Sequence, residues 1–283
     1  AHAIRLAPLD PLILTQSRNT FAAAILLALL LLQRRRLSVH RGDLLRALLL
    51  GAIGVSAANY FYYLAIARTN VATAIMLQYT TPIWIVLYLV ARGRQRVTAA
   101  RLGAVALALT GIALVLGFLR PGGALRLDPI GVTAALLAAF GYAYYILAGE
   151  SLSRRVDPVL VSLFMLLGAA GLWLLINPPW NVWQAHYSSA QWLFMLGFSL
   201  LATLAPTLLY ISGLKYLDAT PAVITSCLEP VVGILLAAIF LDERLGWSQA
   251  MGVACVLAAI VLVQHTAAAP AASVHSVHTN HQR

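Results

Sequence analysis

The chain has few charged residues for its length. Only 10% of its 283 residues are Asp, Glu, Lys or Arg, and 61% are hydrophobic, whereas soluble domains carry about 25% charged residues. This composition argues against a soluble fold and predicts an integral membrane protein. The net charge of +10 does not indicate nucleic-acid binding, because the positive residues lie in short breaks between apolar runs, where they set membrane orientation.

Cysteine is nearly absent, and catalytic patterns are not recognisable. Cys227 and Cys255 each lie inside an apolar run, which favours small packing residues over a disulfide or a metal pair. There is no Gly-rich phosphate loop, zinc-ligand set or Ser/His/Asp arrangement in a plausible context. We therefore predict no catalytic residues, no metal and no cofactor. The tail residues His275, His278 and His281 are evenly spaced, but flexible tails carry such triplets by chance.

Long apolar runs follow one another along the chain. Each run is long enough to cross a hydrocarbon core of about 30 Å. We predict an all-α, polytopic membrane helix bundle with nine spans, roughly at residues 12–32, 45–66, 71–91, 99–119, 129–149, 158–177, 190–211, 219–241 and 248–265. The small, polar segment 266–283 is predicted to be a disordered tail.

Lys and Arg are divided unequally between alternate breaks. Twelve of them lie in one set of breaks, at Arg34, Arg35, Arg36, Arg41, Arg46, Arg92, Arg94, Arg96, Arg101, Arg154, Arg155 and Lys215. Five lie in the other set, at Arg5, Arg68, Arg120, Arg126 and Arg244. The positive-inside rule predicts that the first set and the C-terminus are cytoplasmic. The segment 177–192 has no Lys or Arg but is rich in Trp, as suits the outer membrane interface.

Two stretches of the chain match at a constant offset. Tyr62 corresponds to Tyr210, Ala72 to Thr220, Ala74 to Ala222 and Pro82 to Pro230. The break after Pro82 is rich in arginine and should be cytoplasmic, whereas the break after Pro230 falls on the other side. The two copies therefore cross in opposite directions, as in the inverted repeats of many secondary transporters. We predict two halves, 1–119 and 129–265.

The chain resembles the EamA-type family of the drug/metabolite transporter superfamily. The resemblance rests on the paired spans with Pro82 and Pro230, on the acidic turn and Gly-containing helix at 241–252, and on the Gln-Ser-Arg-Asn run at 16–19. It covers nearly the whole chain. The family pattern has ten helices in two inverted five-helix halves with cytoplasmic termini. Here the first span looks like the family's second, and Gln95 stands where the second copy has Glu243.

The resemblance implies a secondary transporter of small organic solutes in a bacterial-type plasma (inner) membrane. We expect an exporter of metabolites or amino acids that works by alternating access and is driven by a solute or proton gradient. Its partners would be a small-molecule solute and the lipid bilayer; the sequence does not fix the oligomeric state. The alternatives are efflux of drugs or lipophilic cations and, in a different class, a non-transport intramembrane enzyme or assembly protein.

Several predicted spans carry one polar or aromatic face, where a solute would bind. The candidate substrate-binding residues are Asn59, Tyr62, Tyr63, Gln78, Thr81, Tyr142, Tyr145, Thr203, Thr207, Tyr210, Ser226 and Glu229. Polar side chains are costly in hydrocarbon and should face a cavity or another helix. The alternative interpretation is helix packing, because Ser, Thr and Gly also hold membrane helices together.

Two prolines and two ionisable residues lie inside predicted spans. Pro82 and Pro230 each remove a backbone donor, which suits either a hinge or a static kink. Glu229 lies near the midplane, where an isolated charge costs roughly 2.5–3.5 kcal/mol on insertion scales. It is a candidate for proton coupling or solute contact, or else a protonated packing residue. We expect Gln16, Asn19 and Thr20 to face inward; Arg18 can instead extend toward the interface or pair with Glu229.

Overall fold

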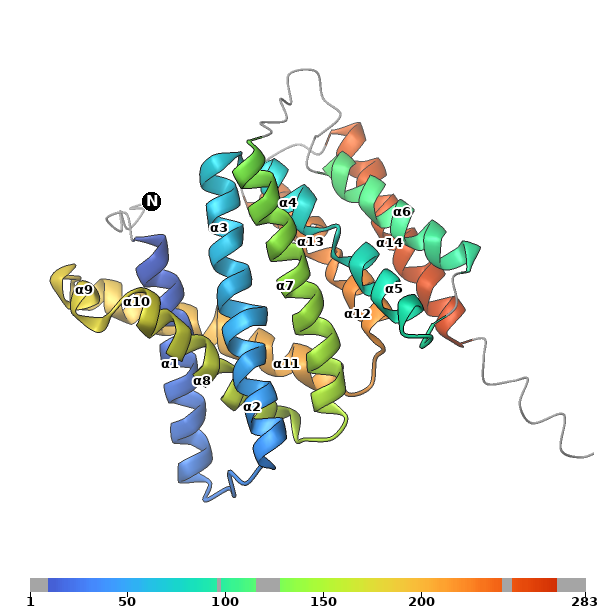
Figure 1. Ribbon diagram of the computed structural model, residues 1–283. Helices are drawn as coiled ribbons and strands as arrows, with labels where there is room; N and C mark the ends of the chain where they lie inside the picture. Colours follow the sequence, from blue (N-terminus) through green and yellow to red (C-terminus); the bar gives the residue numbers. More distant parts are fainter. Residues whose placement is uncertain (1–9, 96–97, 116–127, 241–245, 269–283) are drawn as a thin grey trace, which may run out of the picture. The chain divides into compact units, whose positions relative to one another are not determined.

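The computed structural model describes residues 10–95, 98–115, 128–240 and 246–268. Within these ranges the regular elements are all helical (Figure 1). They are α1 (Pro11–Leu32), α2 (Arg41–Leu49), the π-helix η1 (Leu50–Ala57), α3 (Ala58–Arg68), α4 (Val71–Gln78), α5 (Thr81–Ala91), α6 (Ala99–Val115), α7 (Pro129–Ser153), α8 (Pro158–Ile176), α9 (Pro179–Gln184), α10 (Ser189–Ser199), the π-helix η2 (Leu200–Leu204), α11 (Ala205–Gly213), α12 (Ala219–Ser226), α13 (Leu228–Phe240) and α14 (Trp247–Ala268).

The helices account for the predicted spans. Within the described ranges, six segments are long and apolar enough to cross a membrane: Leu12–Leu32, Arg41–Arg68, Thr73–Ala91, Pro129–Ser153, Pro158–Ile176 and Ser189–Gly213. Shorter apolar helices at Ala99–Val115, Ala219–Val232 and Trp247–Val263 fall on the other three. The predicted all-α membrane helix bundle is confirmed. Residues 116–119, 241 and the tail beyond Ala268 lie outside the described residues, and α14 continues three residues past the predicted span end at 265.

The chain forms two compact units, described separately here. Unit 1 combines the chain up to Phe61 with Phe140–Leu217, and unit 2 combines Tyr62–Ala139 with the chain from Asp218 onward. Each unit thus contains parts of both predicted sequence halves. The units are defined by which helices pack together, whereas the halves are defined by the repeat in the sequence. The division into halves stays a prediction.

In unit 1, α8 packs against α1, α2, η1 and α11. Its contact with η1 is close because small residues lie at the crossing. A Cβ on Gly51 of η1 would collide with the carbonyl oxygen of Met165. Where α8 meets the end of α2, a Cβ on Gly168 would likewise collide with the carbonyl oxygen of Leu48. Ser56 adds a hydrogen bond from its hydroxyl to the carbonyl of Ala169, at 3.0 Å. Close backbone approach with hydroxyl bonds is how membrane helices associate without a hydrophobic driving force.

A reciprocal amide pair joins α1 to the end of α8. Gln16 Nε2 donates to the carbonyl oxygen of Asn177 at 2.8 Å, and Asn177 Nδ2 donates to Gln16 Oε1 at 2.7 Å. Asn177 is the C-cap of α8, so the pair occupies one of the carbonyls that the helix end leaves without an amide partner.

The segment after α1 has a fixed turn. The amide of Arg34 donates to Leu31 O at 2.9 Å and that of Arg35 to Leu30 O at 3.0 Å, the two bonds of a Schellman motif. Arg34 has φ of 51°, a left-handed conformation that glycine normally supplies and that costs other residues roughly 1–2 kcal/mol. The turn directs the chain toward α8, where Arg35 pairs with Asp157.

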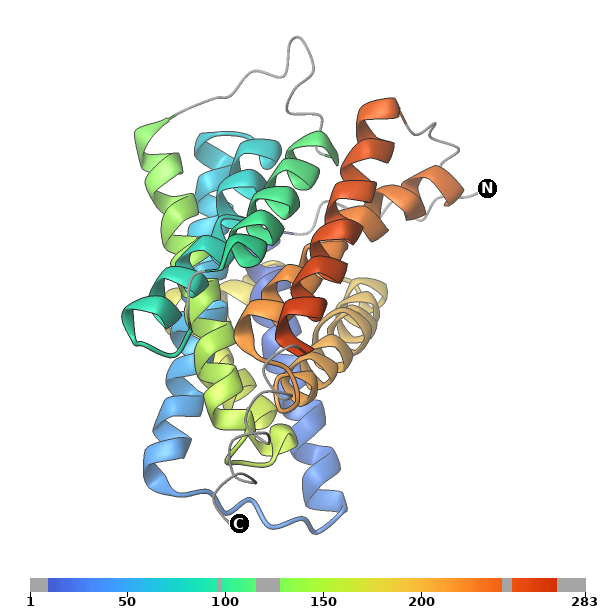
Figure 2. The ribbon, with the colours of Figure 1, turned by 90° about the vertical axis from the view of Figure 1, so that its right-hand side faces the viewer.

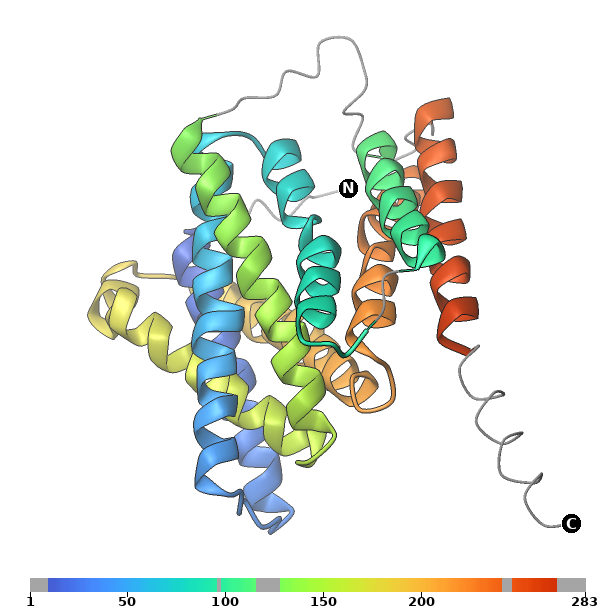
Figure 3. The same cartoon turned by 45° about the vertical axis from the view of Figure 1, so that its right-hand side comes forward.

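In unit 2, α6 and α14 pack side by side (Figures 2 and 3). Gly111 and Gly252 face one another at their crossing. A Cβ on Gly111 would lie 2.8 Å from Gly252 O, and one on Gly252 would lie 2.6 Å from Gly111 O. Ala104, Ala108 and Ala259 are completely buried, so the packed faces of both helices present small side chains, as membrane helix pairs do.

Local irregularities recur at corresponding places in the two predicted copies. The π-helical segments η1 and η2 fall at matching positions of the two copies. The interruption between α4 and α5 likewise matches the interruption between α12 and α13. Within unit 2, Figure 3 shows α4 and α5 (teal) descending while α12 and α13 (orange) ascend. Opposite directions of two matching broken helices are what the predicted inverted repeat requires.

The glycine contact generates a stability prediction. Gly111→Ala should destabilise the protein by about 1–3 kcal/mol, because its Cβ would meet the backbone oxygen of Gly252, which cannot rotate away, at 2.8 Å. Gly103→Ala on the same helix is the matched control, since its Cβ would lie 3.7 Å from a Leu262 side-chain carbon. Thermal unfolding in detergent measures both variants. Equal unfolding temperatures for the two variants would contradict the close approach.

Candidate solute-binding and coupling groups

A break in the helix between α4 and α5 lies just ahead of Pro82. Because proline has no N–H, the carbonyl of Gln78 loses its helical donor. The hydroxyl of Thr81 donates to Gln78 O at 2.6 Å, and that of Thr80 donates to Leu77 O at 2.6 Å. Threonine hydroxyls thus satisfy carbonyls at a site where lipid offers no donor. Thr81 is buried and also contacts the carbonyl of Ala139 at 3.3 Å.

A second break separates α12 from α13, just ahead of Pro230. Cys227 is its single non-helical residue. The Ser226 hydroxyl donates to Ala222 O at 3.0 Å, and the Cys227 thiol lies 3.5 Å from Val223 O. Ser226 therefore bonds within its own helix, as the packing interpretation expects. The breaks confirm that the helical ladder is interrupted beside each proline; a hinge role stays a prediction.

Glu229 lies at the start of α13 and bonds to the other broken helix of unit 2. The Tyr79 hydroxyl donates to Glu229 Oε2 at 3.3 Å. Tyr79 follows the last residue of α4, whereas Glu229 occupies the first turn of α13, where the helix dipole favours a negative charge. Glu229 is nevertheless exposed. An exposed carboxylate in an apolar helix calls for water or a solute beside it, because contact with lipid is costly.

Three tyrosines stack in unit 1. The rings of Tyr142 and Tyr145, three residues apart on α7, lie 5.6 Å apart at 15°, and those of Tyr145 and Tyr210 lie 5.5 Å apart at 18°. Tyr145 in the middle is only 8% exposed, whereas the outer two rings are half-buried. Gly54 permits this packing, since a Cβ there would lie 3.1 Å from Tyr145 Cβ.

The other predicted residues are divided between the units. Tyr62 and Tyr63 pack ring to ring in unit 2 with centroids 5.9 Å apart. In unit 1, Asn59 and Thr207 are half-buried, and Thr203 is buried with no hydrogen-bond partner for its hydroxyl among the described residues. The structure thus brings together the tyrosine stack in one unit and the Tyr79–Glu229 pair in the other.

The polar residues of α1 are largely engaged in local bonds. Gln16 pairs with Asn177, Asn19 Nδ2 donates to Thr15 O at 2.9 Å, and the Thr20 hydroxyl donates to Gln16 O at 2.9 Å. These bonds support helix packing as the role of Gln16 and Asn19, both of which are buried. The carbonyl of Arg18 accepts from the Ser199 hydroxyl at 2.7 Å, which ties this turn of α1 to α10.

Sequence reasoning missed Tyr79. Tyr79 lies three residues ahead of Pro82, and this position could have indicated a side chain outside the regular helix. It also missed the bond from the buried Thr220 hydroxyl to Gln95 Oε1, at 3.1 Å, which joins the first turn of α12 to the segment after α5. Both bonds link residues more than a hundred positions apart.

Comparison with known proteins supplies the family. The model of the EamA-like transporter family matches residues 3–117 and 129–264. A transporter of Archaeoglobus fulgidus is 26% identical over 74% of this chain and 74% of its own length. The inner membrane transporter YicL of Salmonella typhimurium is 25% identical over 88% of this chain and 84% of its own.

Two further similarities concern an exporter and a solved structure. The threonine/homoserine exporter RhtA of Escherichia coli is 28% identical over 75% of this chain and 68% of its own length. A protein of known crystal structure superposes with a TM-score of 0.73 at 20% identity, covering 92% of this chain and 90% of that one; this likeness concerns the fold alone. Because the family model matches most of the chain in two segments, the chain belongs to the EamA-like transporter family.

Proposed function

We propose that this membrane transporter exports small organic solutes, namely metabolites or amino acids, across a bacterial-type inner membrane by alternating access. The observation that carries the proposal is the exposed Glu229 carboxylate beside a broken apolar helix, hydrogen-bonded to Tyr79 at the other break. An exposed carboxylate suits the ammonium group of an amino acid or a transported proton. The similarity to RhtA supports the amino-acid class.

The two predicted sequence halves would move relative to one another during transport. Residues 1–119 and 129–265 would be inverted copies that rock about the solute, with Pro82 and Pro230 as hinges and the C-terminus in the cytoplasm. Within unit 2, Glu229 would supply the charge that the solute contacts, beside the Tyr79 hydroxyl. A gradient of solute or protons would supply the energy.

Efflux of lipophilic cations is the second candidate function. Stacked tyrosines would suit a flat cation, because aromatic faces attract positive charge. The Tyr142–Tyr145–Tyr210 stack is the observation that favours this candidate.

Counterflow in proteoliposomes separates the two functions. We expect saturable uptake of a labelled amino acid such as threonine or homoserine when vesicles are preloaded with it, and little uptake of tetraphenylphosphonium. The reverse preference would support cation efflux. No counterflow of any solute by demonstrably folded protein would overturn both functions.

The carboxylate–tyrosine pair yields a sharper prediction. Glu229→Gln should lower solute affinity roughly ten-fold to a hundred-fold, since a hydrogen bond to a charged group is worth about 1.5–3 kcal/mol. Tyr79→Phe should have a smaller effect, because it removes one donor but leaves the charge.

Controls are available in the same chain. Glu150→Gln removes the ion pair that Glu150 makes with Arg154 four residues on, and Tyr88→Phe alters an exposed tyrosine on α5; both variants should transport normally. An imposed pH gradient should increase solute flux through the wild-type protein. The same gradient should have no effect on flux through Glu229→Gln. Unchanged affinity and unchanged gradient dependence in this variant would remove Glu229 from the account.

A further inference from the structure

One end of unit 1 carries a concentration of positive charge. We call residues 33–46 and 150–157 the basic end of unit 1; they connect α1 to α2 and α7 to α8. The basic end holds seven arginines, namely Arg34, Arg35, Arg36, Arg41, Arg46, Arg154 and Arg155, and three carboxylates, namely Asp43, Glu150 and Asp157. Four positive charges are therefore in excess beside the ends of four membrane helices.

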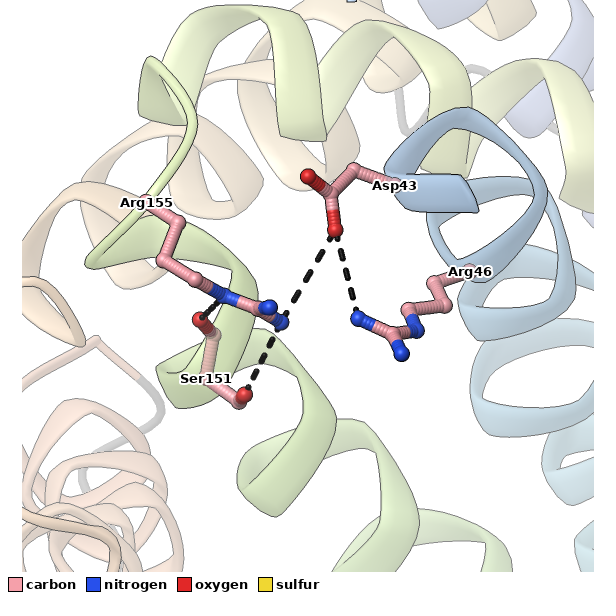
Figure 4. A network of polar contacts seen from close by, with 4 residues as sticks. All are labelled: Asp43, Arg46, Ser151 and Arg155. Carbon is pink, nitrogen blue, oxygen red and sulfur yellow. Dashed lines mark hydrogen bonds and ion pairs between the residues drawn. The ribbon is translucent and has the colours of Figure 1, made fainter. Parts of the chain in front are cut away.

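The three carboxylates are already occupied by four of the arginines. Figure 4 shows Asp43 Oδ1 between Arg46 Nη1, at 3.4 Å, and Arg155 Nη2, at 3.8 Å. Arg155 is also held by Ser151, whose carbonyl and hydroxyl accept from it at 3.1 and 3.3 Å. Arg154 pairs with Glu150 at 3.1 Å, and Arg35 pairs with Asp157. Arg35 and Arg155 thereby connect different helices, whereas the Arg46 and Arg154 pairs each lie within one helical segment.

The other three arginines, Arg34, Arg36 and Arg41, are exposed. Among the residues that the structure describes, they form no ion pair. Arg41 is moreover the first residue of α2, and its N-cap, His40, makes no side-chain capping bond. A cation at a helix N-terminus opposes the helix dipole. Asp43 in the same turn offsets this charge, but its carboxylate is already paired with Arg46 and Arg155, so the Arg41 guanidinium is left for another anion.

The segment that carries these arginines is fixed in place. Leu37 and Val39 pack against the buried cluster that α1 and α8 share, and Arg35 is tied to Asp157. Arg34 occupies the left-handed position of a Schellman turn, where glycine is the residue normally found. A strained arginine on an anchored turn indicates that its charge is used.

Exposed leucines lie directly beside the exposed arginines. Leu31 and Leu32, which end α1, are 58% and 81% exposed, and Leu45 on α2 is 58% exposed. Leu31 and Leu32 precede Arg34 by three and two residues, and Leu45 follows Arg41 by four, about one helical turn. Apolar side chains this close to cations match an amphiphile that has acyl chains and an anionic head. A soluble phosphate would make no use of the leucines.

We propose that the basic end of unit 1 binds the phosphate headgroup of an anionic membrane lipid through Arg34, Arg36 and Arg41, with acyl chains over Leu32 and Leu45. Arginine suits this role because its planar guanidinium donates two parallel hydrogen bonds to phosphate oxygens. Arginines that only direct membrane insertion would need neither a fixed turn nor a strained backbone.

The test compares two bilayers and two variants of the full chain. Wild-type protein in nanodiscs of phosphatidylcholine, with or without phosphatidylglycerol, should unfold at a higher temperature when the anionic lipid is present. The triple variant Arg34→Gly, Arg36→Gln, Arg41→Gln should lose most of this shift. In phosphatidylcholine alone it should be at least as stable as the wild type, because glycine relieves the strain at position 34. The wild-type shift should shrink at high salt.

Arg35→Gln is the matched control. It breaks the Asp157 pair, so it should lower the unfolding temperature by a similar amount in both bilayers and keep the anionic-lipid shift. If the triple variant does not fold, Arg34→Gly alone carries the test, with native mass spectrometry counting retained phosphatidylglycerol. An undiminished shift or lipid count in these variants overturns the proposal. The proposal is also overturned if inorganic phosphate raises the unfolding temperature of the wild type in phosphatidylcholine as much as phosphatidylglycerol does.

Discussion

Hydrocarbon offers no partner to a backbone N–H or C=O, so the chain must satisfy each of these groups itself. The helices do so along most of the described chain, and the departures from regular helix are the informative places. At Pro82 the hydroxyls of Thr80 and Thr81 take over the carbonyls of Leu77 and Gln78. An interruption deep in a span is therefore tolerated because two threonines precede the proline.

The same constraint explains where chemistry can occur. A broken helix exposes polar groups inside a span, and the two breaks of unit 2 bring Tyr79 and Glu229 within hydrogen-bonding distance. Regular spans, by contrast, pack through small residues such as Gly111 and Gly252. Unit 2 thus combines tightly packed helices that resist change with irregular helices that carry a titratable group.

The membrane spans could be predicted from the sequence, whereas the contacts between helices could not. Apolar runs and arginine-rich breaks predicted the spans, because bilayer thickness fixes helix length. Pro82 and Pro230 indicated where helices would be disturbed, but not that the break after α12 would be a single residue, Cys227.

Partners of the polar residues could not be predicted in the same way. Gln16 bonds to Asn177, and Glu229 bonds to Tyr79, which lies 150 positions away. Such pairings depend on which helix faces meet, and periodicity within one helix does not encode that. The tyrosine stack was half predicted: the spacing of Tyr142 and Tyr145 placed them on one face, whereas the third ring, Tyr210, comes from α11.

Aqueous access to Glu229 tests the central claim most directly. In a protein with Cys227 and Cys255 replaced by alanine, Glu229→Cys would be exposed to a charged, membrane-impermeant methanethiosulfonate in vesicles. Leu257→Cys, on the exposed apolar face of α14, is the control that should face lipid and stay unlabelled. The account predicts rapid labelling of Glu229→Cys. Labelling as slow as that of Leu257→Cys would contradict it.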